Sequence, residues 1–341
     1  MDLRQLAALV AIADHGSFSG AAKALYTVQS NVSAHIAKLE RELGVALVDR
    51  ASGRLTAEGA LVAARARRIT AELESVVADL ASLGEEISGH VRIGVIGTTA
   101  RWLVPQLLAE VRQRHPRVRV VVSEGSTVAM LAQLVDGGLD LAVLNWPVDH
   151  PDVLIVPLFA EDLVLLAPAD HPLADRDQIS LGELARYELM LPPAGTPLRD
   201  EIDEATRREG IVLRAAAEID GVRLMASLAM EGVAPTIIPA TAVPGWIQGP
   251  FRWITVAGLP RRYVGLARRS RTHPSAPALA LADLVVEVAR TNGARQRGVE
   301  VVADLLEPPA AGPQPEPAAG PRPAPAAGPR PEPAAGQAGD R

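Results

Sequence analysis

Apolar residues near the amino terminus recur at the spacings of three and four that mark one face of a helix. The first such stripe consists of Leu3, Leu6, Leu9, Val10 and Ala13. Gly16 ends this helix, and Ser17 or Ser19 is expected to cap a second one through the stretch GAAKALY. The pattern therefore predicts two short helices in close succession.

A third stripe predicts a helix over residues 29–43, with Gly44 directly after its last turn. Its buried face consists of Val32, Ile36, Leu39 and Leu43. The stretch LVDRASGRLT follows and predicts a two-stranded wing that turns at Ser52 and Gly53. Thr56 is expected to cap the long helix that comes next.

That long helix carries a heptad pattern. Its apolar positions alternate spacings of four and three, and they are Val62, Ala66, Ile69, Leu73, Val76, Leu80 and Leu83. A helix over residues 57–87 would be about 45 Å long. An apolar seam of this length needs a partner, which is either the rest of the chain or a second copy. We expect homodimerisation, through Val62, Ile69, Leu73, Val76 and Leu80.

From His90 onward, short apolar segments alternate with helical ones. HVRIGVIG, VRVVVSEG and LDLAVLNW are predicted strands, with the helices ARWLVPQLLAEVRQRH and TVAMLAQLVDGG between them. The segment DLVLLAPADHPL follows as an apolar strand that runs into a Pro-rich loop. A second series begins at YELMLPPAGTP and includes RAAAEID, APTIIPA and helices near residues 197–209 and 221–231. RYVGLARR and the helix ALALADLVVEVA close the fold. This alternation is typical of a parallel sheet covered by helices. Two half-domains joined by crossing strands would leave a cleft between them.

The predicted fold class is thus α/β with an all-α winged head, a linker helix and a two-lobed body. The expected limits are residues 1–58 for the head, 59–88 for the linker and 89–292 for the body. Within the body, lobe 1 takes about 89–161 and 260–292, and lobe 2 takes about 162–259. Residues 307–341 repeat Pro, Ala and Gly and have no large apolar side chain, so this tail is expected to be disordered.

Composition narrows the classes of function. The chain has no cysteine, which excludes disulfides, thiolate metal sites and cysteine nucleophiles. It shows neither a signal-peptide pattern nor an apolar run of about 18 residues, so we expect a cytoplasmic protein that does not enter membranes. The net charge is −6, yet the first 70 residues carry nine Lys or Arg against six Asp or Glu. A basic head on an acidic body favours DNA binding by the head.

Short helices, a tight turn and a basic wing together predict a winged helix-turn-helix. The third helix would enter the major groove, where base edges show distinct donor and acceptor patterns. Amides at Gln29 and Asn31 can both donate and accept, as adenine requires. The other candidate DNA contacts are Ser17, Thr27, Ser30, Ser33, His35, Lys38, Arg50 and Arg54. Any one of them alone could equally belong to a solvated helix face, but together they favour a DNA interface.

The segments MDLRQLAALVAIADHGSFSGAAKAL, VQSNVSAHIAKLERELGVALVDR and LTAEG occur in a familiar order and spacing, and GGLDLAV and GVAPTIIPA follow in the body. On these motifs, residues 1 to about 290 resemble the LysR-type transcriptional regulators. The resemblance implies a homo-oligomer, usually a dimer of dimers, that binds an inverted-repeat operator in double-stranded DNA and contacts RNA polymerase if it activates. It also implies a periplasmic-binding-protein-like body in which a small molecule changes the grip on DNA.

Three positions depart from the family pattern. Val28 stands where Ser is usual, so Thr27 would have to cap the third helix from a shifted start. Ala34 stands where Arg is common, which removes an expected phosphate contact. Val48 replaces the usual Phe of the wing strand.

Polar side chains follow the predicted strands of the body, at the ends where open α/β sheets bind ligands. The candidate effector residues are Thr98, Thr99, Ser126, Thr127, Asn145, Trp146, Gly195 and Thr196. Free N–H groups at helix starts favour anions, so we expect a small carboxylate such as an organic acid. The alternative is that the hydroxyls cap only their own helices. Trp146 either stacks on an aromatic effector or fills the cleft, and the resemblance supports Thr98, Thr99 and Thr127 most.

Other classes of function are less favoured. The sequence holds no nucleotide-binding, hydrolase or zinc-protease motif, so we expect neither an enzyme nor a cofactor or metal site. A solute-binding transport protein would share the body but would need an export signal. A nucleoid protein would bind random and operator DNA equally, whereas specific regulators show a ratio of about 10³ to 10⁷.

Overall fold

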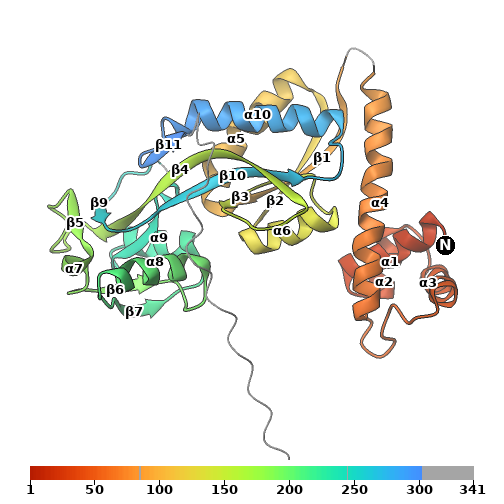
Figure 1. Ribbon diagram of the computed structural model, residues 1–341, viewed down its shortest axis with the longest axis horizontal. Coiled ribbons are helices and arrows are strands. Elements are labelled where there is room, and N and C mark those ends of the chain that lie inside the picture. Colours follow the sequence, from red (N-terminus) through yellow and green to blue (C-terminus); the bar gives the residue numbers. More distant parts are fainter. Residues whose placement is uncertain (84–85, 244, 302–341) are drawn as a thin grey trace, which may run out of the picture. The chain divides into compact units, whose positions relative to one another are not determined.

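The computed structural model describes residues 1–83, 86–243 and 245–301, and the predicted disordered tail lies outside the described residues. Four helices come first and an α/β body follows (Figure 1). The first helices are α1 (Leu3–His15), α2 (Phe18–Ala24), α3 (Gln29–Leu43) and α4 (Ala57–Ala81). No helix in these ranges is long and apolar enough to cross a membrane.

The head buries most of the predicted stripes in one apolar core, in which Leu9, Val32 and Ile36 are inaccessible to solvent. The expected burial of Leu3 and Leu43 is wrong, because these residues lie in the first turn of α1 and the last turn of α3 and are exposed. Helix α3 has the predicted limits, and Gly44 adopts the left-handed conformation after its last turn. The expected capping by Thr27 is wrong. Val28 occupies the N-cap position without a side-chain hydrogen bond. Thr27 Oγ1 instead accepts a hydrogen bond from Asn31 Nδ2 at 2.9 Å, because α3 begins at Gln29 with no shift.

The wing is smaller than predicted. A single isolated bridge joins Val48 and Leu55 where two paired strands were expected. Asp49 stabilises the turn, since its carboxylate accepts hydrogen bonds from Ala51 N at 2.9 Å and from Ser52 Oγ at 2.6 Å. Local side-chain bonds therefore hold the wing in place of a longer ladder.

The first turn of α4 packs against the chain that leads into the wing. A Cβ atom on Gly59 would lie 1.9 Å from the backbone oxygen of Leu47, a fully buried residue. We expect Gly59→Ala to lower the free energy of unfolding of the head by about 1–3 kcal/mol, the usual cost of overpacking. Differential scanning calorimetry measures this loss. Gly182→Ala is the control, because a Cβ there would be no closer than 3.9 Å to its neighbours. Identical transitions for the two variants would show that the head has room at Gly59.

Lobe 1 is a mixed sheet with the strand order β2-β1-β3-β10-β4, and β11 pairs with β4. Its elements are β1 (Ser88–Ile96), α5 (Gly97–Arg114), β2 (Arg117–Gly125), α6 (Thr127–Asp136), β3 (Leu141–Trp146), the first part of β4 (Val153–Pro168), β10 (Arg261–Arg269), α10 (Ala276–Gly293) and β11 (Val299–Val301). Strand β1 runs parallel to β2 and β3, whereas β10 is antiparallel to β3 and β4. This topology brings the carboxyl ends of β1, β2 and β3 to one edge.

Lobe 2 has a separate apolar core and the strand order β4-β8-β6-β7. Its other elements are β5 (Gln178–Ser180), α7 (Leu181–Leu184), β6 (Glu188–Leu191), α8 (Pro197–Arg208), β7 (Arg214–Glu218), α9 (Val222–Met230), β8 (Thr236–Pro239), the 3₁₀ helix η1 (Ala240–Ala242) and β9 (Phe251–Ala257). Strands β5, β9 and β11 and the first part of β4 were not predicted from the sequence. Strand β5 has three residues and pairs with β9, so a distant partner defines it more than its own pattern does.

Strand β4 crosses from lobe 1 into lobe 2, and a buried polar group marks the crossing. Glu161 is inaccessible to solvent, and its Oε2 accepts hydrogen bonds from Thr241 Oγ1 at 2.6 Å and Thr241 N at 3.2 Å. Burial raises the pKa of Glu161, although the charge of Arg262 and the bonds from Thr241 oppose this. Arg262 of β10 forms an ion pair of 2.9 Å with Glu201 of α8. Both contacts tie the crossing to lobe 2.

Candidate DNA interface and effector site

The front of α3 presents the predicted base-reading side chains to solvent. Gln29, Ser30 and Asn31 are exposed, while Val32 and Ile36 on the opposite side are buried in the head. The helical period thus separates a polar face from an apolar one. One amide hydrogen of Asn31 is engaged by Thr27, so Asn31 keeps its carbonyl oxygen and one N–H for an outside partner.

The remaining candidates of the head surround this front. Ser33 and His35 are half-buried, and Lys38 is exposed with its Nζ 4.0 Å from Asp2 Oδ2. Ser17 caps α2, because its Oγ accepts a hydrogen bond from Gly20 N at 3.0 Å. Its hydroxyl proton remains available as a donor.

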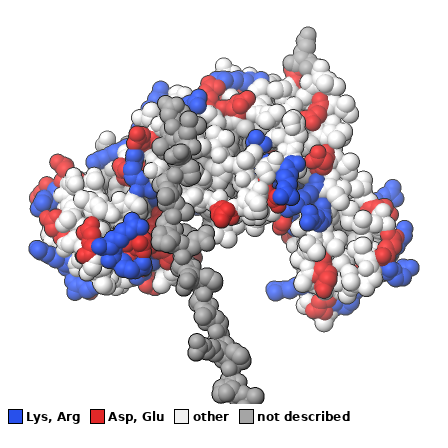
Figure 2. Space-filling model, in the orientation of Figure 1, with Lys and Arg blue, Asp and Glu red and all other residues white. Residues whose placement is uncertain are grey.

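Arg50 is held at the base of the wing. Its Nη2 lies 2.7 Å from Glu40 Oε2, and its guanidinium carbon lies 5.3 Å from the centroid of the Phe18 ring. Burial acts to raise the pKa of Glu40, but hydrogen bonds from Leu47 N and Arg50 outweigh it and lower the pKa. Arg50 is therefore already paired, whereas Arg54 is exposed. Figure 2 shows Lys and Arg interspersed with Asp and Glu over the head.

The apolar seam of α4 divides into two parts. Val62 and Ala66 pack against the core of the head. The later positions are exposed, from 42% for Ile69 through 45% for Leu73 to 81% for Leu83. The helix predicted over residues 57–87 is too long, because α4 ends at Ala81 and Leu83 lies in the turn after it. Within the described part of the chain, nothing buries this second part.

Three neighbouring strands bring most of the candidate effector side chains to one edge of lobe 1. Ile96 at the end of β1 is paired with Gly125 of β2, and Val95 is paired with Val143 of β3. The last residues of β3 and residues in the first turns of α5 and α6, which follow β1 and β2, form what we call the effector edge. It consists of Thr98, Thr99, Thr127, Asn145 and Trp146.

Two buried polar atoms of the effector edge have no hydrogen-bond partner among the described residues, and they are Thr99 Oγ1 and Asn145 Oδ1. Thr127 Oγ1, by contrast, accepts a hydrogen bond from Asn145 N at 3.1 Å. The first turn of α5 also lacks a side-chain cap, because Ile96 is its N-cap residue. A buried polar atom without a partner costs about 1–3 kcal/mol. A polar molecule that bonded to both atoms would remove this cost.

The other candidates make local contacts. Ser126 Oγ accepts a hydrogen bond from Ala129 N at 3.3 Å and so caps α6. Thr196 Oγ1 donates to Pro193 O at 2.8 Å, and Gly195 before it has a left-handed backbone. Trp146 packs edge-to-face against Tyr263, with ring centroids 5.8 Å apart.

An ion pair between the lobes was not predicted from the sequence. Glu124 of β2 lies 2.7 Å from Arg223 of α9. A Cβ on Gly97 would lie 2.7 Å from Glu124 Oε1, so this carboxylate stands beside the first turn of α5. The position of Glu124 at a strand end is a usable sequence signal. The sequence around Arg223 gives no such signal, because only the packing of lobe 2 brings this residue close to Glu124.

An open cavity of about 590 Å³ lies away from the effector edge. Residues of α1, α4 and the end of α6 line it, among them Asp14, Arg67 and Gly137. No residue predicted for DNA, dimer or effector contacts lines this cavity.

A winged helix-turn-helix head, a linker helix with an exposed apolar seam and a two-lobed α/β body define the class of protein: a DNA-binding transcriptional regulator with a two-lobed α/β body. Residues 3–60 match the family model of bacterial regulatory helix-turn-helix proteins of the lysR family. Residues 84–290 match the LysR substrate binding domain. The chain belongs to the LysR family of DNA-binding transcriptional regulators.

Curated relatives cover most of the chain. A probable hydrogen peroxide-inducible genes activator of Streptomyces viridosporus is 34% identical over 274 residues, which are 79% of this chain and 88% of the relative. The DNA-binding transcriptional dual regulator OxyR of Escherichia coli K12 is 32% identical over 279 residues, which are 79% of this chain and 90% of OxyR.

Solved structures share the fold over nearly their whole length. A cysteine-substituted variant of full-length OxyR from Pseudomonas aeruginosa has a TM-score of 0.70 at 25% identity, with 91% of this chain and 99% of that chain covered. Full-length CbnR in complex with its target DNA has a TM-score of 0.62 at 26% identity, with coverages of 85% and 100%.

Proposed function

We propose that this chain binds an operator as a homodimer and that a small polar molecule at the effector edge changes its grip on the DNA. One observation carries the second part of the proposal: Thr99 Oγ1 in the first turn of α5 and Asn145 Oδ1 near the end of β3 are buried and have no hydrogen-bond partner among the described residues. The exposed seam from Ile69 to Leu83 supports the dimer, because a row of apolar side chains is costly to leave in water. The proposal also includes the assembly of dimers into tetramers. If the protein activates transcription, it would in addition contact RNA polymerase.

The chemical class of the effector has two candidates. The uncapped first turn of α5 favours a carboxylate, as the sequence pattern predicts, although Glu124 beside that turn opposes a second negative charge. The names of the relatives favour hydrogen peroxide, a neutral molecule that can donate to both unpartnered oxygens. Peroxide would have to act on this chain without a thiol, because the sequence contains no cysteine.

We expect Thr99→Val to abolish the response to the effector while operator binding stays within about twofold of the unaltered protein. Valine keeps the shape of threonine and removes only the hydroxyl, and Thr99 is far in sequence from the head. Operator affinity is measured by fluorescence anisotropy with and without hydrogen peroxide, acetate, succinate and benzoate. Thr196→Val is the matched control, since that hydroxyl bonds within its own turn.

The same titrations separate the two candidate effectors. A shift in operator affinity with a carboxylate but not with peroxide supports the organic acid, and the reverse result supports peroxide. A Thr99→Val protein that responds as strongly as the unaltered one would remove the effector edge as the binding site.

A further inference from the structure

Helix α6 begins at the effector edge and ends against the linker helix α4. At its start, Thr127 Oγ1 bonds to the backbone N–H of Asn145. The helix ends at Asp136, and Gly137 follows with a left-handed φ of 82°. Its ten residues span about 15 Å. Helix α6 therefore connects the effector edge directly to the linker helix α4.

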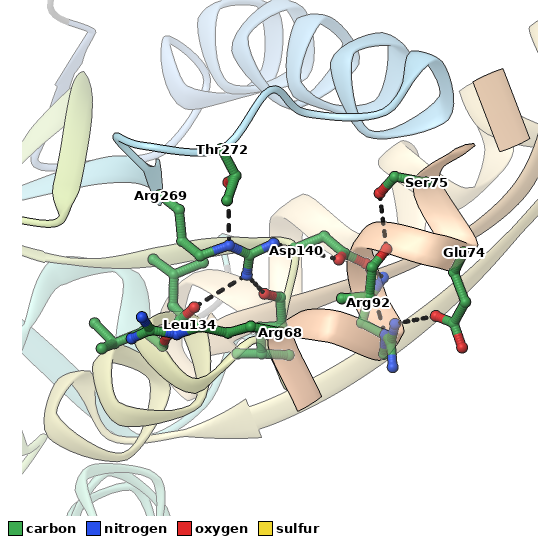
Figure 3. A network of polar contacts seen from close by, with 11 residues as sticks. Arg68, Glu74, Ser75, Arg92, Leu134, Asp140, Arg269 and Thr272 are labelled. Atoms are coloured by element: carbon green, nitrogen blue, oxygen red, sulfur yellow. Dashed lines mark hydrogen bonds and ion pairs between the residues drawn. The ribbon is translucent and has the colours of Figure 1, made fainter. Parts of the chain in front are cut away.

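Two arginines hold backbone carbonyl groups at the carboxyl end of α6 and in the turn that follows it (Figure 3). Arg68 of α4 donates through Nε to Val135 O at 2.7 Å. Arg269 of β10 donates through Nη1 to Leu134 O at 3.0 Å and to Leu139 O at 2.6 Å. The last carbonyl groups of a helix have no partner within the helix and carry the negative end of its dipole, so guanidinium groups suit them. We call these three bonds the α6 clasp.

The backbones of α4 and α6 also meet directly at the clasp. A Cβ on Gly137 would lie 3.2 Å from Arg68 Cα and 3.3 Å from Arg68 N. The Cγ atom of Arg68 lies 3.3 Å from the same position. Glycine at position 137 therefore lets the end of α6 approach α4 more closely than a residue with a Cβ could, and the bond from Arg68 to Val135 O joins the two helices there.

A second contact fixes α4 to lobe 1 further along. Asp79 Oδ1 accepts a hydrogen bond of 2.8 Å from Ala276 N in the first turn of α10, where Ser275 gives no side-chain cap. Asp79 comes eleven residues after Arg68, which is about 16 Å along the helix. The linker thus places a cation at the negative end of α6 and an anion at the positive end of α10.

Between these points, Arg92 of β1 pairs with Glu74 of α4, and its Nε lies 3.7 Å from Asp140 Oδ2 (Figure 3). Figure 2 shows a group of basic side chains where lobe 1 meets α4. Burial lowers the pKa of Arg269, Asp140 opposes this effect and Arg68 adds to it. The carboxylates of Asp140 and Glu74 offset the positive charge that these arginines bring together.

We propose that α6 transmits the state of the effector edge to the linker helix through Arg68, with Asp79 as the fixed point of the motion. This inference rests on the proposed function, since α6 has a state to transmit only if the edge binds a molecule. Arg68 is next to Ile69 of the exposed seam, and Ala66 on the same helix packs against the head. A displacement at Arg68 therefore reaches both the dimer contact and the DNA-binding head.

A double-mutant cycle on the full chain tests the coupling without any effector. Thr127→Val removes the hydroxyl at the start of α6, and Arg68→Ala removes the one bond of the α6 clasp that comes from α4. Amide hydrogen exchange of residues 57–81, followed by mass spectrometry, reports on α4. We expect Thr127→Val to change the exchange rate of α4 by at least threefold when Arg68 is present, and by less than about 1.5-fold in the Arg68→Ala background. Independent sites this far apart ordinarily combine within about twofold.

Two variants serve as controls. Thr127→Ser keeps the hydroxyl and should leave the exchange of α4 unchanged, and Arg65→Ala removes an exposed arginine of the same helix and should not weaken the effect of Thr127→Val. The inference is overturned if Thr127→Val leaves α4 unaffected, or if its effect is equal with and without Arg68. Either result leaves the effector edge itself intact as a hypothesis, because that edge is tested separately by Thr99→Val.

Discussion

Leu73→Asp is expected to convert the proposed dimer into monomers. Leu73 lies in the middle of the exposed seam of α4, and a two-fold symmetric contact would place one new carboxylate from each chain in an apolar interface. Burying an unpaired charge costs several kcal/mol, so we expect the dimer dissociation constant to rise at least about 100-fold. Sedimentation velocity at micromolar concentration measures the change.

Helical content should stay the same in Leu73→Asp, because Leu73 contributes little to the core of its own chain at 45% exposure. Ala60→Asp is the matched control. It adds the same charge to an exposed position of α4 outside the seam, and it should remain dimeric. A Leu73→Asp protein that sediments as the unaltered dimer would show that another surface holds the two copies together.

Gln29→Ala is expected to weaken binding to the operator by about 1–3 kcal/mol, or roughly 5- to 150-fold, and to leave binding to random duplex nearly unchanged. Gln29 is exposed at the front of α3, where its amide can both donate and accept at a base edge. Anisotropy titrations at one fixed salt concentration with both duplexes give the two affinities.

Lys38→Ala provides the contrast for Gln29→Ala. Lys38 is exposed further along α3, where an ammonium group suits phosphate contacts. Its removal should weaken binding to operator and random duplex by the same factor. An equal loss on both duplexes for Gln29→Ala as well would place Gln29 among the backbone contacts and remove its role in base reading.

The head was predictable because its signals are local. The limits of α3 follow from an apolar stripe and from Gly44, which takes the left-handed conformation that glycine tolerates best. The capping of α3 was not predictable from the same stretch. The Thr27 hydroxyl could accept a hydrogen bond either from a backbone N–H of α3 or from a side chain, and in the structure it accepts one from the Asn31 side chain. The heptad pattern predicts one continuous seam, but the head covers Val62 and Ala66 and leaves only the later positions exposed.

In the body, the effector edge could be predicted from the sequence, whereas contacts between distant elements could not. Polar residues after β1, β2 and β3 could be assigned to one edge, because parallel strands end on the same side of a sheet. The ion pair of Glu124 with Arg223 and the bond from Arg68 to Val135 join elements that are distant in sequence. Such contacts depend on how the two lobes and the linker helix pack against each other, so they cannot be predicted from residue type or spacing.

Competition between duplexes tests whether the front of α3 reads a specific base sequence. The purified full chain is used to select fragments from genomic DNA, and the most enriched fragment is titrated against a shuffled duplex of the same length and composition. We expect the selected fragment to bind at least about 10³-fold more tightly than the shuffled duplex at physiological salt. A ratio near one, with and without the candidate effectors, would contradict sequence-specific reading by the front of α3.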